Sequence, residues 1–357
     1  MKPLVFSLLA SLFIMIFVCS LNSREPEFTL LAKSGDVEYK ANKRSWKPIK
    51  SNQEFGRWDM IRIEKGGYAC LVSKDGRTLE LKADSRRQDY TVTQMKKKLK
   101  SAGGDISSKF AEYVVDEMSD TDDFFSEDDY HDDMSTTGAV NRAHRKDVDT
   151  KKEISSMTGD DETSELLNAV GDAFLGGGEL IIVSRVPKNS YLIDKEIDFS
   201  WYSNHHVHVY AIHLVDRHNK EIFKQNVLDT FVTVNFSSVN LIKGENYYWY
   251  VTDKKGGRKS DEYCLQWMSS NEEENVRDTV DMIYKGFGGE DSPFGNIAVA
   301  RYYADKNIMT RALSAFENAM DLAPGVERYE YIYAKYLDRI GLTDEAKKMV
   351  SKSVVKK

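Results

Sequence analysis

The sequence predicts a multidomain α+β protein with an N-terminal all-β domain, a central β-sandwich and C-terminal α-helical hairpins. Apolar and polar residues alternate between glycine-containing turns in residues 28–90 and again in residues 178–268, a pattern typical of half-buried antiparallel strands. Over residues 271–357 the apolar spacing changes to a helical period. A chain of 357 residues has room for these parts.

Residues 1–22 are predicted to form a signal peptide or a membrane anchor. Lys2 precedes the apolar run Leu4–Val18, and one positive charge before an apolar core of this length is typical of a secretory signal peptide. Cleavage after Ser20 is the favoured interpretation. Retention as an anchor is an alternative, although a spanning helix usually needs about 20 apolar residues. Lipidation at Cys19 is another, and all three place the remaining chain outside the cytoplasm.

The N-terminal domain, residues 28–90, consists of short alternating segments separated by turns at Gly66-Gly67 and Asp75-Gly76. Its segments, in order, are SGDVEY from Ser34, Trp46-x-Pro-Ile, Asp59-x-Ile-Arg, Gly-Gly-Tyr-Ala-x-Leu-Val and Gly-Arg-Thr-Leu-Glu-Leu. This order resembles the β-rich FecR-type domain of exported bacterial proteins, most like those of Gram-negative bacteria of the Bacteroidetes kind.

That resemblance implies a small all-β domain outside the cytoplasm, which in some relatives is a sensor arm that relays outer-membrane occupancy to a sigma factor. The regulator that names the family has a cytoplasmic segment before its membrane span. Only Met1-Lys2-Pro3 precede the apolar run here, so we do not expect a direct anti-sigma role.

Two segments follow the N-terminal domain. Residues 91–118 are predicted to be a helical extension, because Ile106–Met118 places its apolar residues on one helical stripe. Residues 119–165 are predicted to be an acidic and polar disordered linker, since Asp116–Asp133 holds ten acidic residues and no Lys or Arg. Calcium binding is the alternative, although Asp120–Asp132 lacks the glycine that an EF-hand loop needs.

Residues 178–268 are predicted to form the β-sandwich, because short strands recur at spacings of about ten residues. The expected strands are Leu180–Val183, Glu196–Trp201, Val207–Leu214, Glu221–Phe223, Phe231–Val234, Tyr247–Thr252 and Glu262–Trp267. Pro187 at the first turn, Trp201 in the second strand and the segment KGENYYWYV before the last strand resemble a fibronectin-III-like or immunoglobulin-like domain. The resemblance implies that Phe199 and Trp201 are core residues. It also implies that the domain binds a ligand or acts as a spacer, rather than catalysing a reaction.

Five of the seven histidines fall in this predicted sandwich. His206 and His208 are two residues apart on an expected strand, so they share a face and are candidate ligands for a transition metal. His213 or a carboxylate is the candidate third ligand. The alternative is that these histidines face solvent or pack, and we therefore assign no metal site and keep His206 and His208 as candidates.

The helical region contains the best internal repeat of the chain. Three positions recur after 34 residues, namely Ala300, Ala312 and Phe316 as Ala334, Ala346 and Val350. This spacing, with Pro324 after the first copy, resembles the tetratricopeptide repeat. The resemblance implies a concave surface that binds a peptide or helix of a partner protein. The alternative is that two helical hairpins simply pack on the sandwich.

Motifs for catalysis and cofactor binding are missing from the sequence. It holds no phosphate-binding Gly-x-x-x-x-Gly-Lys-Ser/Thr loop and no Gly-x-Ser-x-Gly nucleophile elbow. The three cysteines have no metal-binding spacing, and we expect Cys70 and Cys264 to be free thiols, with a cross-domain disulfide as the alternative. The net charge of −7 argues against nucleic-acid binding. We expect no catalytic residues, no cofactor and no enzymatic activity.

These observations favour an exported envelope protein, in the periplasm or anchored in the membrane facing it. The predicted function is a non-catalytic scaffold that binds an envelope protein partner through the tetratricopeptide-like helices and a candidate cell-surface ligand through the β domains. A periplasmic sensor in a cell-surface signalling pathway is one alternative, and metal or glycan binding is another. Membrane association through the N-terminal segment is expected if that segment is retained. The residues that bind the partner are not identified by the sequence.

Overall fold

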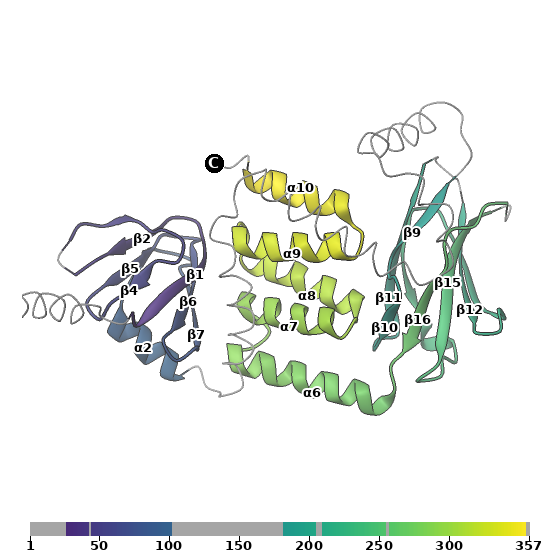
Figure 1. The fold of residues 1–357 in the computed structure, drawn as a ribbon, viewed down its shortest axis with the longest axis horizontal. Coiled ribbons are helices and arrows are strands. Elements are labelled where there is room, and N and C mark those ends of the chain that lie inside the picture. Colours follow the sequence, from purple (N-terminus) through teal and green to yellow (C-terminus); the bar gives the residue numbers. More distant parts are fainter. Residues whose placement is uncertain (1–25, 43, 102–180, 205–208, 255–256, 355–357) are drawn as a thin grey trace, which may run out of the picture.

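The computed structural model describes residues 26–42, 44–101, 181–204, 209–254 and 257–354. Within these residues the chain is a multidomain α+β protein, with β-sheets in its N-terminal and central regions and helices at its C-terminal end. The helices lie between the two β-rich parts, so the order in space differs from the order along the chain (Figure 1). The predicted leader, the stripe Ile106–Met118 and the predicted linker lie outside the described residues.

The N-terminal module contains two four-stranded antiparallel sheets, with strand orders β4-β1-β6-β7 and β3-β2-β5-β8. Its strands are β1 (Phe28–Ser34), β2 (Val37–Lys40), β3 (Lys47–Pro48), β4 (Glu54–Phe55), β5 (Met60–Ile63), β6 (Tyr68–Ser73), β7 (Thr78–Lys82) and β8 (Gln88–Thr91). Alternate residues such as Ile61 and Ile63 are fully buried, as the period of two requires. Gly67 lies directly before β6, and a Cβ at this position would lie 2.8 Å from Cγ2 of Ile63, so a larger residue would force a shift.

Helix α2 (Val92–Ser101) follows β8 directly and closes one side of this module. Val92, Met95 and Leu99 recur at helical spacing and join the module's buried core. Because this apolar stripe faces inward, Lys97 and Lys98 of the same helix are exposed.

The middle module contains a five-stranded sheet of order β10-β16-β15-β12-β13 and a three-stranded sheet of order β14-β11-β9. Its strands are β9 (Ile182–Val186), β10 (Ser190–Leu192), β11 (Glu196–Ser203), β12 (Tyr210–Asp216), β13 (Glu221–Val227), β14 (Phe231–Asn235), β15 (Asn246–Asp253) and β16 (Tyr263–Trp267). Each expected strand overlaps an observed one. Strand β10 was not predicted, because three residues are too few to show an alternating pattern.

Aromatic side chains fill the core of the middle module. Trp249 is completely buried, its ring centroid lies 4.8 Å from that of Phe199, and its Nε1 donates a hydrogen bond of 2.8 Å to the carbonyl of Pro187. Phe199 and Trp201 are both buried, as predicted. Trp249 therefore supplies apolar area and also satisfies its one polar atom.

The helical bridge, as we name helices α6 to α10, forms the centre of the molecule (Figure 1). Its helices are α6 (Ser270–Phe287), α7 (Pro293–Asp305), α8 (Met309–Leu322), α9 (Glu327–Arg339) and α10 (Thr343–Val354). The side chain of Ser292 caps α7 by accepting a hydrogen bond from the amide of Gly295, and Pro293 begins the helix. Gly288, at a φ of +92°, ends α6 in the left-handed conformation.

The repeated alanines of the two helical hairpins occupy matching buried positions. Ala300 and Ala334 are fully buried in α7 and α9, and Ala312 and Ala346 are fully buried in α8 and α10. Small residues at these positions let neighbouring helices approach closely.

Replacing Trp249 by Ala should destabilise the protein by about 3–5 kcal/mol, because the change leaves a cavity in a closed core. Chemical denaturation of the full chain measures the loss. Trp58→Ala is the matched control, because Trp58 is 58% exposed, and it should change the unfolding free energy by less than about 0.5 kcal/mol. Equal losses in both variants would contradict the packing described here.

Candidate functional site

The helical bridge contacts the N-terminal module through a shared apolar core. Leu31, Ala32, Tyr68 and Cys70 belong to the hydrophobic cluster of the helices rather than to the core of their own module. These residues come from β1 and β6, so one face of that sheet is covered by the bridge. The N-terminal module is therefore docked on the helices by buried surface.

A polar cluster lies within this contact. Tyr68 Oη donates a hydrogen bond of 2.5 Å to Glu80 Oε1 and lies 2.9 Å from Tyr329 Oη. Since the hydroxyl hydrogen of Tyr68 is used in the hydrogen bond to Glu80, Tyr329 is the donor to Tyr68. The amide of Phe294 also donates to Glu80 Oε1, at 2.7 Å, so the carboxylate accepts from the first turn of α7.

Burial shapes the ionisation of this cluster. It raises the pKa of the Glu80 carboxyl, and the hydrogen bonds from Tyr68 and Phe294 only partly oppose it. Burial also raises the pKa of Tyr68 and of Tyr329, so both phenols stay protonated and can donate.

Arg328 closes the contact from the helical side. It is only 9% exposed; its Nη1 donates to the carbonyl of Leu31 at 2.6 Å and its Nη2 donates to Asn52 Oδ1 at 2.7 Å. Because the planar guanidinium is held by these two hydrogen bonds, it orients α9 against β1 and the turn after β3.

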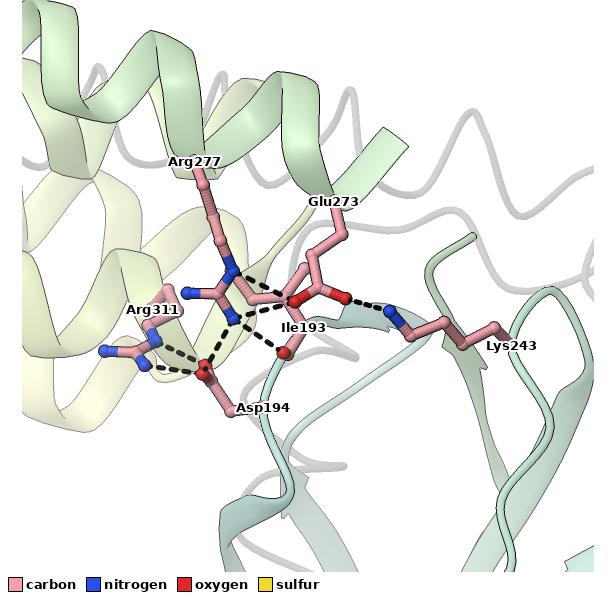
Figure 2. A network of polar contacts seen from close by, with 6 residues as sticks. All are labelled: Ile193, Asp194, Lys243, Glu273, Arg277 and Arg311. Atoms are coloured by element: carbon pink, nitrogen blue, oxygen red, sulfur yellow. Dashed lines mark hydrogen bonds and ion pairs between the residues drawn. The ribbon is translucent and has the colours of Figure 1, made fainter. Parts of the chain in front are cut away.

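The contact between the bridge and the middle module combines buried apolar residues, namely Val186, Ile193 and Met268, with a network of ion pairs (Figure 2). Asp194 accepts hydrogen bonds from Nε and Nη2 of Arg311, the second at 2.6 Å, and lies 3.6 Å from Nη2 of Arg277. Arg277 also donates to Glu273 at 2.9 Å and to the carbonyl of Ile193 at 3.1 Å.

Two loops meet beside this network. The connection between α7 and α8 places the carbonyl of Asn307 2.9 Å from the amide of Tyr191, and the hydroxyl of Ser190 accepts from the amide of Met309 at 3.0 Å. Strand β10 is thereby bonded to the bridge through its own backbone. The connection between α9 and α10 helps to line a pocket of about 340 Å³. Its lining residues are Lys188, Asn189, Ala304, Asn307, Met309, Tyr336, Arg339 and Ile340.

The described structure does not test the candidate metal ligands. His206 and His208 lie outside the described residues. His213 is buried, with Nδ1 2.7 Å from Glu221 Oε2 and Nε2 3.0 Å from Thr252 Oγ1, so both ring nitrogens are engaged. In the described parts of the chain, no group of three or more His, Cys, Asp or Glu is arranged to hold a metal ion. Cys70 and Cys264 are free thiols.

Sequence reasoning missed the residues that join the modules. Tyr68 and Tyr329 are 261 positions apart, and Asp194 and Arg311 are 117 apart. No local motif links such residues, and each taken alone has the character of an ordinary strand or helix residue.

No family model matches this chain, and no curated protein matches it. Among solved structures, the crystal structure of a β-1,2-glucanase from Parabacteroides distasonis is a match, at 13% sequence identity and a TM-score of 0.20. The match covers 49% of this chain and 34% of that chain, so this chain spans about a third of the glucanase.

This match corrects one prediction. The matched protein is an enzyme, so the expectation that this chain is not an enzyme is withdrawn. Catalytic groups contributed by distant segments leave no local motif, and the lack of such motifs was the basis of that expectation. At a TM-score of 0.20 the likeness carries no activity or substrate to this chain. In the regions that the structure describes, no helix is long and apolar enough to cross a membrane.

The buried carboxyl of Glu80 predicts a pH dependence of stability. Its folded pKa lies above the ordinary 4.5, so the folded state holds the proton more tightly than the unfolded chain. The associated stability is fully present below pH 4.5 and is lost as pH rises through the raised pKa. Glu80→Gln keeps an acceptor for Tyr68 without the charge, and should flatten the dependence of melting temperature on pH as the pH rises above 4.5.

The control for this measurement is Glu54→Gln, at an exposed carboxylate on β4 of the same module. It should keep the pH dependence of the parent. If Glu80→Gln also kept it, the ionisation of Glu80 would not control the contact.

The ion pairs of Figure 2 predict an energetic coupling between the middle module and the bridge. A double-mutant cycle of Asp194→Ala and Arg311→Ala should give about 1 kcal/mol, the upper end for pairs that remain open to solvent. Urea denaturation of the four proteins measures it, and added salt should reduce it. A coupling near zero at low salt would show that the network does not hold the two parts together.

Proposed function

We propose that this chain is an exported envelope protein that acts as a binding scaffold, in which the helical bridge holds two β modules at a set separation. The FecR-like and immunoglobulin-like assignments of those modules remain part of the proposal. What supports it is the arrangement in Figure 1, where the bridge separates the modules and contacts both. Buried contacts on one side and an ion-pair network on the other favour a rigid unit.

The tetratricopeptide-like assignment of the helices is also proposed. The buried alanine pairs at a separation of 34 residues support it. However, the N-terminal ends of α7 and α9 contact the N-terminal module through Phe294 and Arg328, and the opposite loops contact the middle module. We therefore propose that the ends of the helices make contacts within the chain, and that the partner protein binds at another surface.

An exposed apolar surface on the middle module carries the proposal for the partner site. It consists of Ile181, Tyr202, Leu228 and Phe231, which are between 39% and 74% exposed. They lie on or beside the three-stranded sheet of order β14-β11-β9. We name these four residues the apolar patch.

Backbone register places Tyr202 and Phe231 of the patch on the outer face of this sheet. Phe231 pairs with Ser200, and Tyr202 pairs with Val183, while the alternate residues Phe199 and Trp201 point into the core. Strand β14 is at the edge of the sheet, where an extended segment of a partner protein can add a strand and cover Phe231. Apolar surface of this kind is typical of protein contacts.

Crosslinking and pull-down from membranes should test the patch with full-length protein. The double variant Leu228→Ser and Phe231→Ser is expected to lose a reproducible envelope partner, because it removes the two most exposed apolar side chains of the patch. Ile242→Ser is the matched control, since Ile242 is 59% exposed in a loop of the same module. An unchanged partner list in the double variant would contradict the proposal.

The alternative proposal is a periplasmic sensor in a signalling pathway. It would be favoured by retention of a membrane anchor together with an inner-membrane regulator that co-purifies with the chain. Deleting everything after Ser269 would not separate the two proposals, because it removes the bridge and both of its contacts.

A further inference from the structure

The N-terminal module is positively charged in a negatively charged protein. Residues 27–100 hold 18 Lys and Arg against 10 Asp and Glu, a formal charge of +8, whereas the whole chain carries −7. Such an asymmetry within one chain indicates a local electrostatic role for this module.

Part of this charge gathers around a hollow of about 510 Å³, lined by Glu27, Arg57, Val92, Thr93, Lys96 and Lys97. Arg57 and Lys97 are exposed, and Lys96 lies 2.7 Å from Glu27, the one carboxylate among the lining residues. The hydrogen bond from Lys96 lowers the pKa of Glu27, and the charges of Lys74 and Arg57 act in the same direction. Three of the lining residues are therefore cations and one is an anion, and the charge of Lys74 also acts on that anion.

An exposed aromatic side chain contacts one of these cations. Trp58 is 58% exposed, and the guanidinium of Arg57 lies over its ring at 5.0 Å from the centroid. Tryptophan beside lysine and arginine is the combination found where proteins meet the interfacial layer of a membrane. A site for a free anion has no need of an exposed indole.

The fold holds this surface in a fixed orientation. Met95 and Leu99 of α2 are buried in the module, so Lys96 and Lys97 are kept on the outer side of the helix. Glu27 lies directly before β1, nine positions after the apolar run Leu4–Val18 ends, so the basic surface is close in sequence to the most apolar stretch of the chain.

We propose that the basic surface formed by Arg57, Trp58, Lys74, Lys96 and Lys97 binds the anionic phosphate headgroups of a lipid bilayer. The lysines and arginine supply attraction to the charged surface, and Trp58 enters the interfacial layer. This inference is independent of the proposed scaffold function and of the apolar patch.

Co-sedimentation of the full-length protein with vesicles tests the proposal. Vesicles of phosphatidylcholine alone are compared with vesicles in which a third of the lipid is phosphatidylglycerol, so that the difference isolates the effect of lipid charge from any apolar insertion. The parent should bind the charged vesicles at least tenfold more tightly, and added salt should weaken that binding.

The double variant Lys96→Gln and Lys97→Gln should lose most of this difference. The matched control is Lys220→Gln with Lys224→Gln, which removes the same charge from exposed positions of the middle module and should bind like the parent. Equal losses in both double variants would show that only net charge matters, and no loss in the first would place binding elsewhere; either result overturns the proposal.

Trp58→Ala separates a bilayer from a free phosphate. It should weaken binding to charged vesicles several-fold, while inorganic phosphate at millimolar concentration should leave binding of the parent unchanged. Displacement of the parent by inorganic phosphate together with undiminished vesicle binding by Trp58→Ala would indicate a site for a soluble anion, and would overturn the assignment to a membrane surface.

Discussion

The arrangement of this protein depends on the buried contact between Tyr68 and Tyr329, in which Tyr68 also donates a hydrogen bond to Glu80. It joins a strand near the start of the chain to a helix near its end. A buried hydroxyl or carboxylate without a partner would cost free energy, so the docked position is the one in which all three groups are satisfied. The apolar residues around the cluster supply buried surface area, and the hydrogen bonds fix the position of β6 relative to α9.

Both contacts of the bridge bury apolar residues, and they differ in their polar groups. On the N-terminal side, apolar burial surrounds a small polar cluster, and salt has little access to it. On the other side, Asp194, Arg277 and Arg311 remain partly exposed, so their attraction is screened by solvent and ions. The first contact is therefore sensitive to protonation, while the second is sensitive to ionic strength.

The surfaces left uncovered by this arrangement are chemically distinct. The N-terminal module presents lysine, arginine and an exposed tryptophan, whereas the middle module presents an apolar face beside an edge strand. The two proposed binding surfaces lie on different modules, which the bridge separates (Figure 1).

The sequence by itself determined the elements: alternation predicted the sheets, and the repeated alanines predicted the helical hairpins, because both patterns are local and periodic. It could not show short β10, whose position depends on pairing with β16 and on bonds to Asn307. The candidate site could not be predicted from the sequence either. Tyr68, Arg328 and Asp194 acquire their roles from residues more than a hundred positions away, and only the tertiary structure brought these partners together.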